Sequence, residues 1–77
     1  ENMARALDIG SVCVKTTGRE AGKKAVVLEV VDGAHVMVQG FGVRKRKCNI
    51  AHLFPTGKKV NVGKNVTEKE LKEILAQ

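Results

Sequence analysis

The chain has 77 residues and a formal charge of +6, with 14 Lys and Arg against 8 Asp and Glu. This length fits a single domain, residues 1–77, and is too short for a catalytic cleft between two lobes. No apolar run approaches the ~20 residues of a transmembrane helix, and no secretory signal is evident, so we expect no membrane partner. The excess of positive charge indicates a polyanionic partner.

The first half of the chain contains two predicted strands, 11–15 and 25–31, because both are rich in β-branched residues. A polar loop with two glycines, 16–24, joins them. Alternation along the second strand places Glu29 toward water. The residues that alternation turns toward the core are Val26, Leu28 and Val30.

Asp32-Gly33 predicts a tight two-residue hairpin turn, because Gly accepts the positive φ of such turns. The returning strand is 35–39, followed by a second turn at 40–42. Residues 43–50 are predicted to be extended, with charge on both faces. Alternation groups Arg44 and Arg46 with Cys48 and Ile50, and groups Lys45 and Lys47 with Val43.

The next segment, 51–54, is expected to place Leu53 and Phe54 in the core. Pro55-Thr56-Gly57 predicts a break in the chain. Residues 58–62 then form a last strand, with Val60 and Val62 facing inward.

The C-terminal segment, 67–76, is the one predicted helix. Thr67 and Glu70 have the spacing of a capping box, and Val66 and Leu71 that of a hydrophobic staple. An apolar stripe at helical spacing predicts docking against the body of the protein, and a groove for a partner protein is the alternative. The stripe consists of Leu71, Ile74 and Leu75.

These elements predict a mainly β fold, a small β-barrel with one short C-terminal α-helix. Cys13 and Cys48 lack the close spacing of metal ligands, so we expect no metal and no cofactor. Buried thiols are the simplest reading of the two cysteines, and a disulfide is the alternative. Nucleophile-elbow and phosphate-loop signatures are absent, so we expect no enzyme and no small-molecule substrate.

The positive charge is concentrated in the middle of the chain. Residues 33–67 hold seven Lys or Arg and no acid, and four of the seven are consecutive. Like charges in sequence repel, and a phosphate backbone would relieve this repulsion. A solvated strand edge is the alternative. We therefore interpret Arg44, Lys45, Arg46 and Lys47 as the main candidates for contact with RNA.

Further candidates for RNA binding lie outside this run. Asn49 and His52 would bind sugar or base edges, or else satisfy nearby backbone groups. We expect Glu20 to be an intramolecular partner that orients Arg19. With only two aromatic residues, the chain favours recognition of RNA backbone and shape over base stacking. The basic candidates outside the run are Arg19, Lys23 and Lys24 in the first loop, and Lys58 and Lys59, with Lys64, in a secondary set that a solvated surface would also explain.

The stretch 18–30, a glycine-bearing basic loop followed by apolar β-formers, resembles the KOW motif. Together with Gly42-Val43-Arg44-Lys45-Arg46-Lys47 and Asn49-Ile50-Ala51-His52-Leu53, it resembles the archaeal and eukaryotic large-subunit ribosomal protein fourteen-e family. The resemblance implies an SH3-like KOW barrel over residues 8–62, with the helix 67–76 packed on or beside it. It also implies a structural, RNA-binding role in the cytoplasmic ribosome, among neighbouring ribosomal proteins.

A KOW-type protein-interaction module of the transcription machinery is the alternative function. In that case an exposed strand edge or the apolar stripe of the helix would be the working surface, and the charge would be incidental. The two functions differ in their response to salt, because only phosphate binding weakens steeply with ionic strength.

Overall fold

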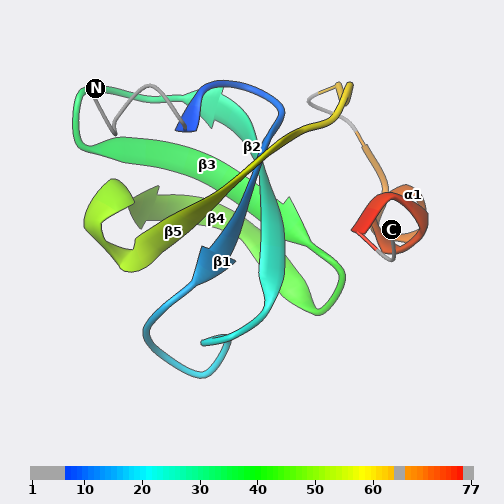
Figure 1. Ribbon diagram of the computed structural model, residues 1–77, viewed down its shortest axis with the longest axis horizontal. Coiled ribbons are helices and arrows are strands. Elements are labelled where there is room, and N and C mark those ends of the chain that lie inside the picture. Colours follow the sequence, from blue (N-terminus) through cyan, green and yellow to red (C-terminus); the bar gives the residue numbers. More distant parts are fainter. Residues whose placement is uncertain (1–6, 64–65, 76–77) are drawn as a thin grey trace.

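A computed structural model describes residues 7–63 and 66–75 (Figure 1). Among the described residues it places five strands, the short 3-10 helix η2 and one α-helix. In chain order these are β1 (Ser11–Lys15), β2 (Lys24–Val30), β3 (His35–Gly40), β4 (Val43–Asn49), η2 (Ile50–His52), β5 (Leu53–Lys59) and α1 (Glu68–Leu75).

The five strands form one antiparallel sheet in the order β4-β3-β2-β1-β5, so β4 and β5 are its outer strands. The sheet is strongly curled, and β5 crosses over the strands behind it before the chain continues to α1 (Figure 1). The helix lies to one side of the sheet. The prediction of a mainly β, barrel-like fold with a single C-terminal helix is therefore confirmed.

Strand β2 is buried on both faces, which explains its uninterrupted apolar run. Ala25 and Val27 belong to one core cluster, whereas Val26 and Leu28 belong to a second. The first cluster is enclosed by the curled sheet. The second lies between the sheet and α1, where it also includes Val12 and Leu71. The domain thus has two small cores that share one strand.

Two residues predicted to be in the core are exposed instead. Val30 is 46% exposed, because a register shift between Val27 and Glu29 interrupts the alternation of β2 near its end. Phe54 is 61% exposed. Its neighbour Leu53 points into the first core, so Phe54, one residue further along the same strand, faces outward.

The predicted break at Pro55 is wrong, because β5 runs through it. A proline removes one backbone donor, which an outer strand of a sheet tolerates. The strand predicted over 58–62 correspondingly ends at Lys59. Val60 and Val62 lie beyond that strand, yet they are half-buried against the second core, so their inward orientation is confirmed.

The β2–β3 connection is longer than the predicted two-residue turn. It spans residues 31–34, and Gly33 does not have a positive φ. The side chain of Asp32 shapes the loop instead: its Oδ1 accepts the backbone N–H of Ala34 at 2.7 Å and lies 3.1 Å from Nδ1 of His35. These contacts lower the pKa of Asp32 below its usual value.

The helix starts as its sequence predicts. Thr67 N donates to Glu70 Oε1 at 2.9 Å and Glu70 N donates to Thr67 Oγ1 at 3.2 Å, which forms the capping box. Leu71 is fully buried and Val66 packs against the same cluster, so the stripe is confirmed as a docking face. Ala76, the last residue of the predicted helix, lies outside the described residues.

Both cysteines are buried in the first core and neither forms a disulfide. Burial raises the pKa of the Cys13 thiol to about 11. The thiol is therefore protonated at neutral pH, as expected for a packing residue.

Candidate nucleic-acid interface

The four consecutive basic residues lie along β4, an outer strand of the sheet. All four side chains are exposed, whereas the flanking residues Val43 and Cys48 are buried in the first core. The strand is therefore held at both ends and presents its middle to solvent. We call this surface, formed by Arg44, Lys45, Arg46 and Lys47, the basic edge.

A β-bulge explains why Val43 and Cys48, five residues apart in β4, both face the first core. Val38 of β3 pairs with Arg46, and Gly40 pairs with Val43, so two residues of β4 oppose one of β3 between these pairs. The extra residue shifts the alternation, and Val43 faces the same core as Cys48. The predicted grouping of Val43 with Lys45 and Lys47 is therefore wrong.

Glu20 connects the first loop to the bulge. Its Oε1 lies 2.9 Å from Lys15 Nζ, and its Oε2 accepts the backbone N–H of Arg44 at 3.1 Å. Lys15 is only 8% exposed, so the carboxylate neutralises a nearly buried ammonium group. The hydrogen bonds from Lys15 and from the Arg44 N–H lower the pKa of Glu20. Glu20 is thus an intramolecular partner as expected, although it binds Lys15 rather than Arg19.

The loop between β1 and β2 lies against the start of β4. Gly22 adopts a φ of 87°, which lets the loop turn back so that its N–H reaches Lys15 O at 2.7 Å. Lys23 Nζ then donates to Gly42 O at 3.3 Å, immediately before β4. The exposed side chains of Arg19 and Lys23 therefore belong to the same end of the molecule as the basic edge.

The remaining predicted RNA-binding residues lie outside the basic edge. Asn49 Oδ1 accepts the N–H of Ala51 at 2.8 Å and caps η2, as its alternative local role predicted. The side chain of His52 is exposed on η2. Lys24, Lys58 and Lys59 line a hollow beside α1, and β5 is the outer strand opposite β4. Lys64 lies outside the described residues.

Sequence reasoning missed the contact between α1 and the β3–β4 turn. Glu68 Oε2 accepts the backbone N–H of Gly42 at 3.1 Å, and Lys72 Nζ lies 5.2 Å from the ring centroid of Phe41. Phe41 is 52% exposed, so the ring covers no core. The only sequence signal was an aromatic residue between two glycines, which gives no indication of its distant partner.

The described residues also contain no group of three or more His, Cys, Asp or Glu side chains that would hold a metal ion. No helix in the described part of the chain combines the length and the apolar character needed to cross a bilayer.

Comparison with known proteins identifies close relatives. The chain is 46% identical over 76 residues to large ribosomal subunit protein eL14 of Sulfolobus acidocaldarius, covering 94% of this chain and 79% of that protein. The identity to the protein of the same name from Methanococcus maripaludis is 46% over 67 residues, covering 87% and 86%. That from Pyrobaculum calidifontis is 43% identical over 77 residues, covering 95% and 75%. No family model matches the chain.

Proposed function

Because the chain belongs to the eL14 family of large ribosomal subunit proteins, we propose that it binds ribosomal RNA through the basic edge. It is a structural constituent of the large subunit, and its place of action is the ribosome in the cytoplasm. Ribosomal RNA and neighbouring ribosomal proteins are its proposed partners. The role is structural, and we propose neither a catalytic activity nor a small-molecule substrate.

One observation carries the RNA-binding proposal: four consecutive cationic side chains are all exposed on an outer strand. The planar guanidinium groups of Arg44 and Arg46 suit two parallel hydrogen bonds to a phosphate, and the ammonium groups of Lys45 and Lys47 act as point charges. Binding to a phosphate backbone releases counterions and relieves the mutual repulsion of the four charges.

The first loop supports the same surface. The contact of Glu20 with the Arg44 N–H keeps the bulge in place, and the contact of Lys23 with Gly42 O holds the loop beside it. Arg19 and Lys23 then extend the cationic surface beyond β4. We propose that this combined surface follows an RNA backbone rather than reading single bases, because no aromatic ring lies within the basic edge.

The alternative role in transcription would use an exposed strand edge or the apolar stripe of the helix as the working surface. Leu71, the first residue of that stripe, is fully buried against the second core. The named relatives are ribosomal proteins. We therefore favour the ribosomal role.

The test is assembly of a double variant, Arg44→Gln with Arg46→Gln, into large subunits in cells that lack the wild-type protein. We expect reduced recovery of the variant in the large-subunit peak of a sucrose gradient after a high-salt wash, because two phosphate contacts are lost. The isolated variant should keep the thermal stability of the wild type, since both side chains are exposed.

The matched control is Lys69→Glu, which lowers the net charge by the same two units at an exposed position of α1. The control should be recovered like the wild type. Equal recovery of the Arg44 and Arg46 variant would contradict the assignment of RNA binding to the basic edge. Absence of the wild-type protein from large subunits would contradict the ribosomal role itself.

A further inference from the structure

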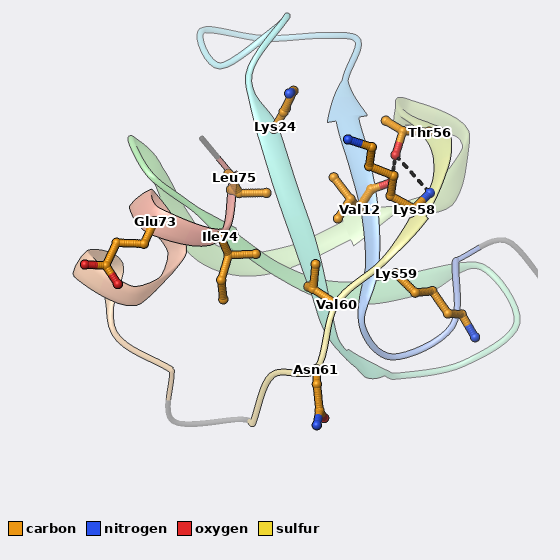
Figure 2. A pocket seen from close by; sticks show the side chains of 10 residues that line it. All are labelled: Val12, Lys24, Thr56, Lys58, Lys59, Val60, Asn61, Glu73, Ile74 and Leu75. Carbon is orange, nitrogen blue, oxygen red and sulfur yellow. Dashed lines mark hydrogen bonds between the residues drawn. The ribbon is translucent and has the colours of Figure 1, made fainter. Parts of the chain in front are cut away.

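A second surface, which the RNA-binding proposal does not use, lies between α1 and the end of β5 (Figure 2). It is a hollow of about 580 Å³, which we call the α1 groove. Residues from β1, β2, β5, the segment after β5 and the last turn of α1 line it. They are Val12, Lys24, Thr56, Lys58, Lys59, Val60, Asn61, Glu73, Ile74 and Leu75.

The floor of the α1 groove is aliphatic. Ile74 and Leu75 point from α1 toward the strands, and Val60 faces them from the opposite wall (Figure 2). All three side chains are only partly buried, whereas the same helix buries Leu71 completely. Apolar surface that stays open to water in a concave site is stabilised when an apolar group covers it.

The rim of the groove is cationic. Three exposed lysines, Lys24, Lys58 and Lys59, stand against one acid, Glu73. The lining therefore has a net positive charge, which favours an occupant with acidic groups. The groove needs a partner that combines negative charge with aliphatic or other apolar side chains.

RNA satisfies only one of these two requirements. It supplies the negative charge, but the described residues that line the groove include no aromatic ring on which a base could stack, so nothing in RNA would cover the aliphatic floor. A polypeptide with an apolar side chain flanked by Asp or Glu satisfies both. The hollow also has the volume of a site for a few side chains rather than for a nucleic-acid helix.

We propose that the α1 groove is a docking site for a segment of a neighbouring large-subunit protein, one that places an apolar side chain between acidic residues. The inference rests on the proposed function, because it requires that the chain sits in the large subunit. It reassigns Lys58 and Lys59 from RNA binding to protein binding. The chain then contacts RNA along the outer strand β4 and a neighbouring protein beside the outer strand β5.

The proposal is tested by photo-cross-linking in assembled large subunits. A lysine analogue with a diazirine group replaces Asn61, an exposed residue of the groove wall, and in a second variant it replaces Lys45 of the basic edge. Large subunits are purified through a high-salt wash and irradiated, and the cross-linked products are sequenced. From position 61 we expect a cross-link to another large-subunit protein, at a segment with an apolar residue beside Asp or Glu.

Three results would overturn the docking proposal. They are a cross-link from position 61 to ribosomal RNA alone, a cross-link to another part of this same chain, and no cross-link although the protein is present in the subunit. Absence of this chain from the subunit would overturn the ribosomal role as well. Failure of the docking proposal alone can therefore be distinguished from failure of the proposed function. The variant at position 45 should cross-link to ribosomal RNA, and this result tests the basic edge independently of the groove.

Charge reversal tests whether the occupant of the groove is acidic. Lys58→Glu with Lys59→Glu should lower the yield of the protein cross-link from position 61 by roughly tenfold, because an acidic segment is then repelled. Lys69→Glu is the control for added negative charge, because Lys69 is exposed on α1 outside the groove lining, and it should leave that yield unchanged. An equal yield from both charge-reversal variants would contradict the acidic nature of the occupant.

Discussion

The basic edge and the α1 groove lie at the two outer strands of one sheet, yet they are built in opposite ways. The basic edge consists of four residues in succession, spread along one strand. The groove draws its apolar surface from Val60, just after β5, and from Ile74 and Leu75 of α1, which are distant from Val60 in the chain. The first surface is local in sequence, whereas the second exists only once the helix has docked.

This difference separates the two surfaces energetically. The basic edge depends on β4, which is anchored in the first core by Val43 and Cys48. The groove depends on α1, which is held by Leu71 in the second core. A change that loosens α1 should therefore remove the groove and leave the basic edge in place.

Replacement of Leu71 by Ala should have the largest effect on stability, because it empties a fully buried site beneath the helix. We expect a loss of about 2–5 kcal/mol from the contact that docks α1. Limited trypsin digestion should then cut rapidly at Lys69 and Lys72. The affinity for RNA should remain unchanged while the sheet is folded.

Ile74→Ala is the matched control. Ile74 lies on the same helix but is only partly buried, so its truncation should cost less unfolding free energy than that of Leu71. If the folded Leu71→Ala variant lost RNA affinity as well, the two regions would not be independent.

Replacement of Glu20 by Gln should have an intermediate effect, acting on the basic edge and not on the groove. The variant leaves the nearly buried ammonium of Lys15 without its counter-charge, so we expect a loss of about 1–3 kcal/mol of unfolding free energy. Chemical denaturation at pH 7 measures this loss. A variant as stable as the wild type would show that Glu20 does not hold the first loop to β4.

The same contact predicts a dependence on pH. The folded state lowers the pKa of Glu20 below 4.5, so its carboxylate stabilises the fold above that pH. This contribution is lost as the pH falls through the lowered value. The wild type should therefore lose more stability on acidification than Glu20→Gln, which retains the contributions of other carboxylates with a lowered pKa, such as Asp32.

Replacement of Thr67 by Ala should have the smallest effect, confined to the start of α1. It removes the hydroxyl that accepts the Glu70 N–H, which costs about 1 kcal/mol. Hydrogen exchange of α1 amides should become faster, while amides of β2 and β3 keep their protection. Thr67→Ser retains the hydroxyl and should exchange like the wild type. Faster exchange in both variants would show that the cap is not the cause.

The parts of the fold that could be predicted from the sequence are those that local patterns determine. The capping box, the apolar run of β2 and the basic run of β4 were all recognisable without coordinates. Val30 and Phe54 were placed wrongly because strict alternation does not anticipate a register shift or the starting phase of a strand. The prediction of a break at Pro55 was wrong because the sequence does not reveal that β5 is an outer strand.

The candidate RNA-binding surface was likewise predictable only where a local sequence pattern determines it. The run of four basic residues was recognisable in the sequence, but the bulge within it and the partner of Glu20 were not predicted. Lys15 pairs with a residue five positions away only because the first loop turns back at Gly22. The groove could not be predicted at all, since its walls meet only in the folded chain.

The most direct test of RNA binding by the basic edge is the salt dependence of binding between the isolated protein and large-subunit ribosomal RNA. A plot of log affinity against log salt should be shallower by roughly 2 for Arg44→Gln with Arg46→Gln, because about two fewer phosphates are neutralised. Lys69→Glu, which lowers the net charge by the same two units on the exposed surface of α1, should keep the slope of the wild type. An unchanged slope for the Arg44 and Arg46 variant would contradict the assignment.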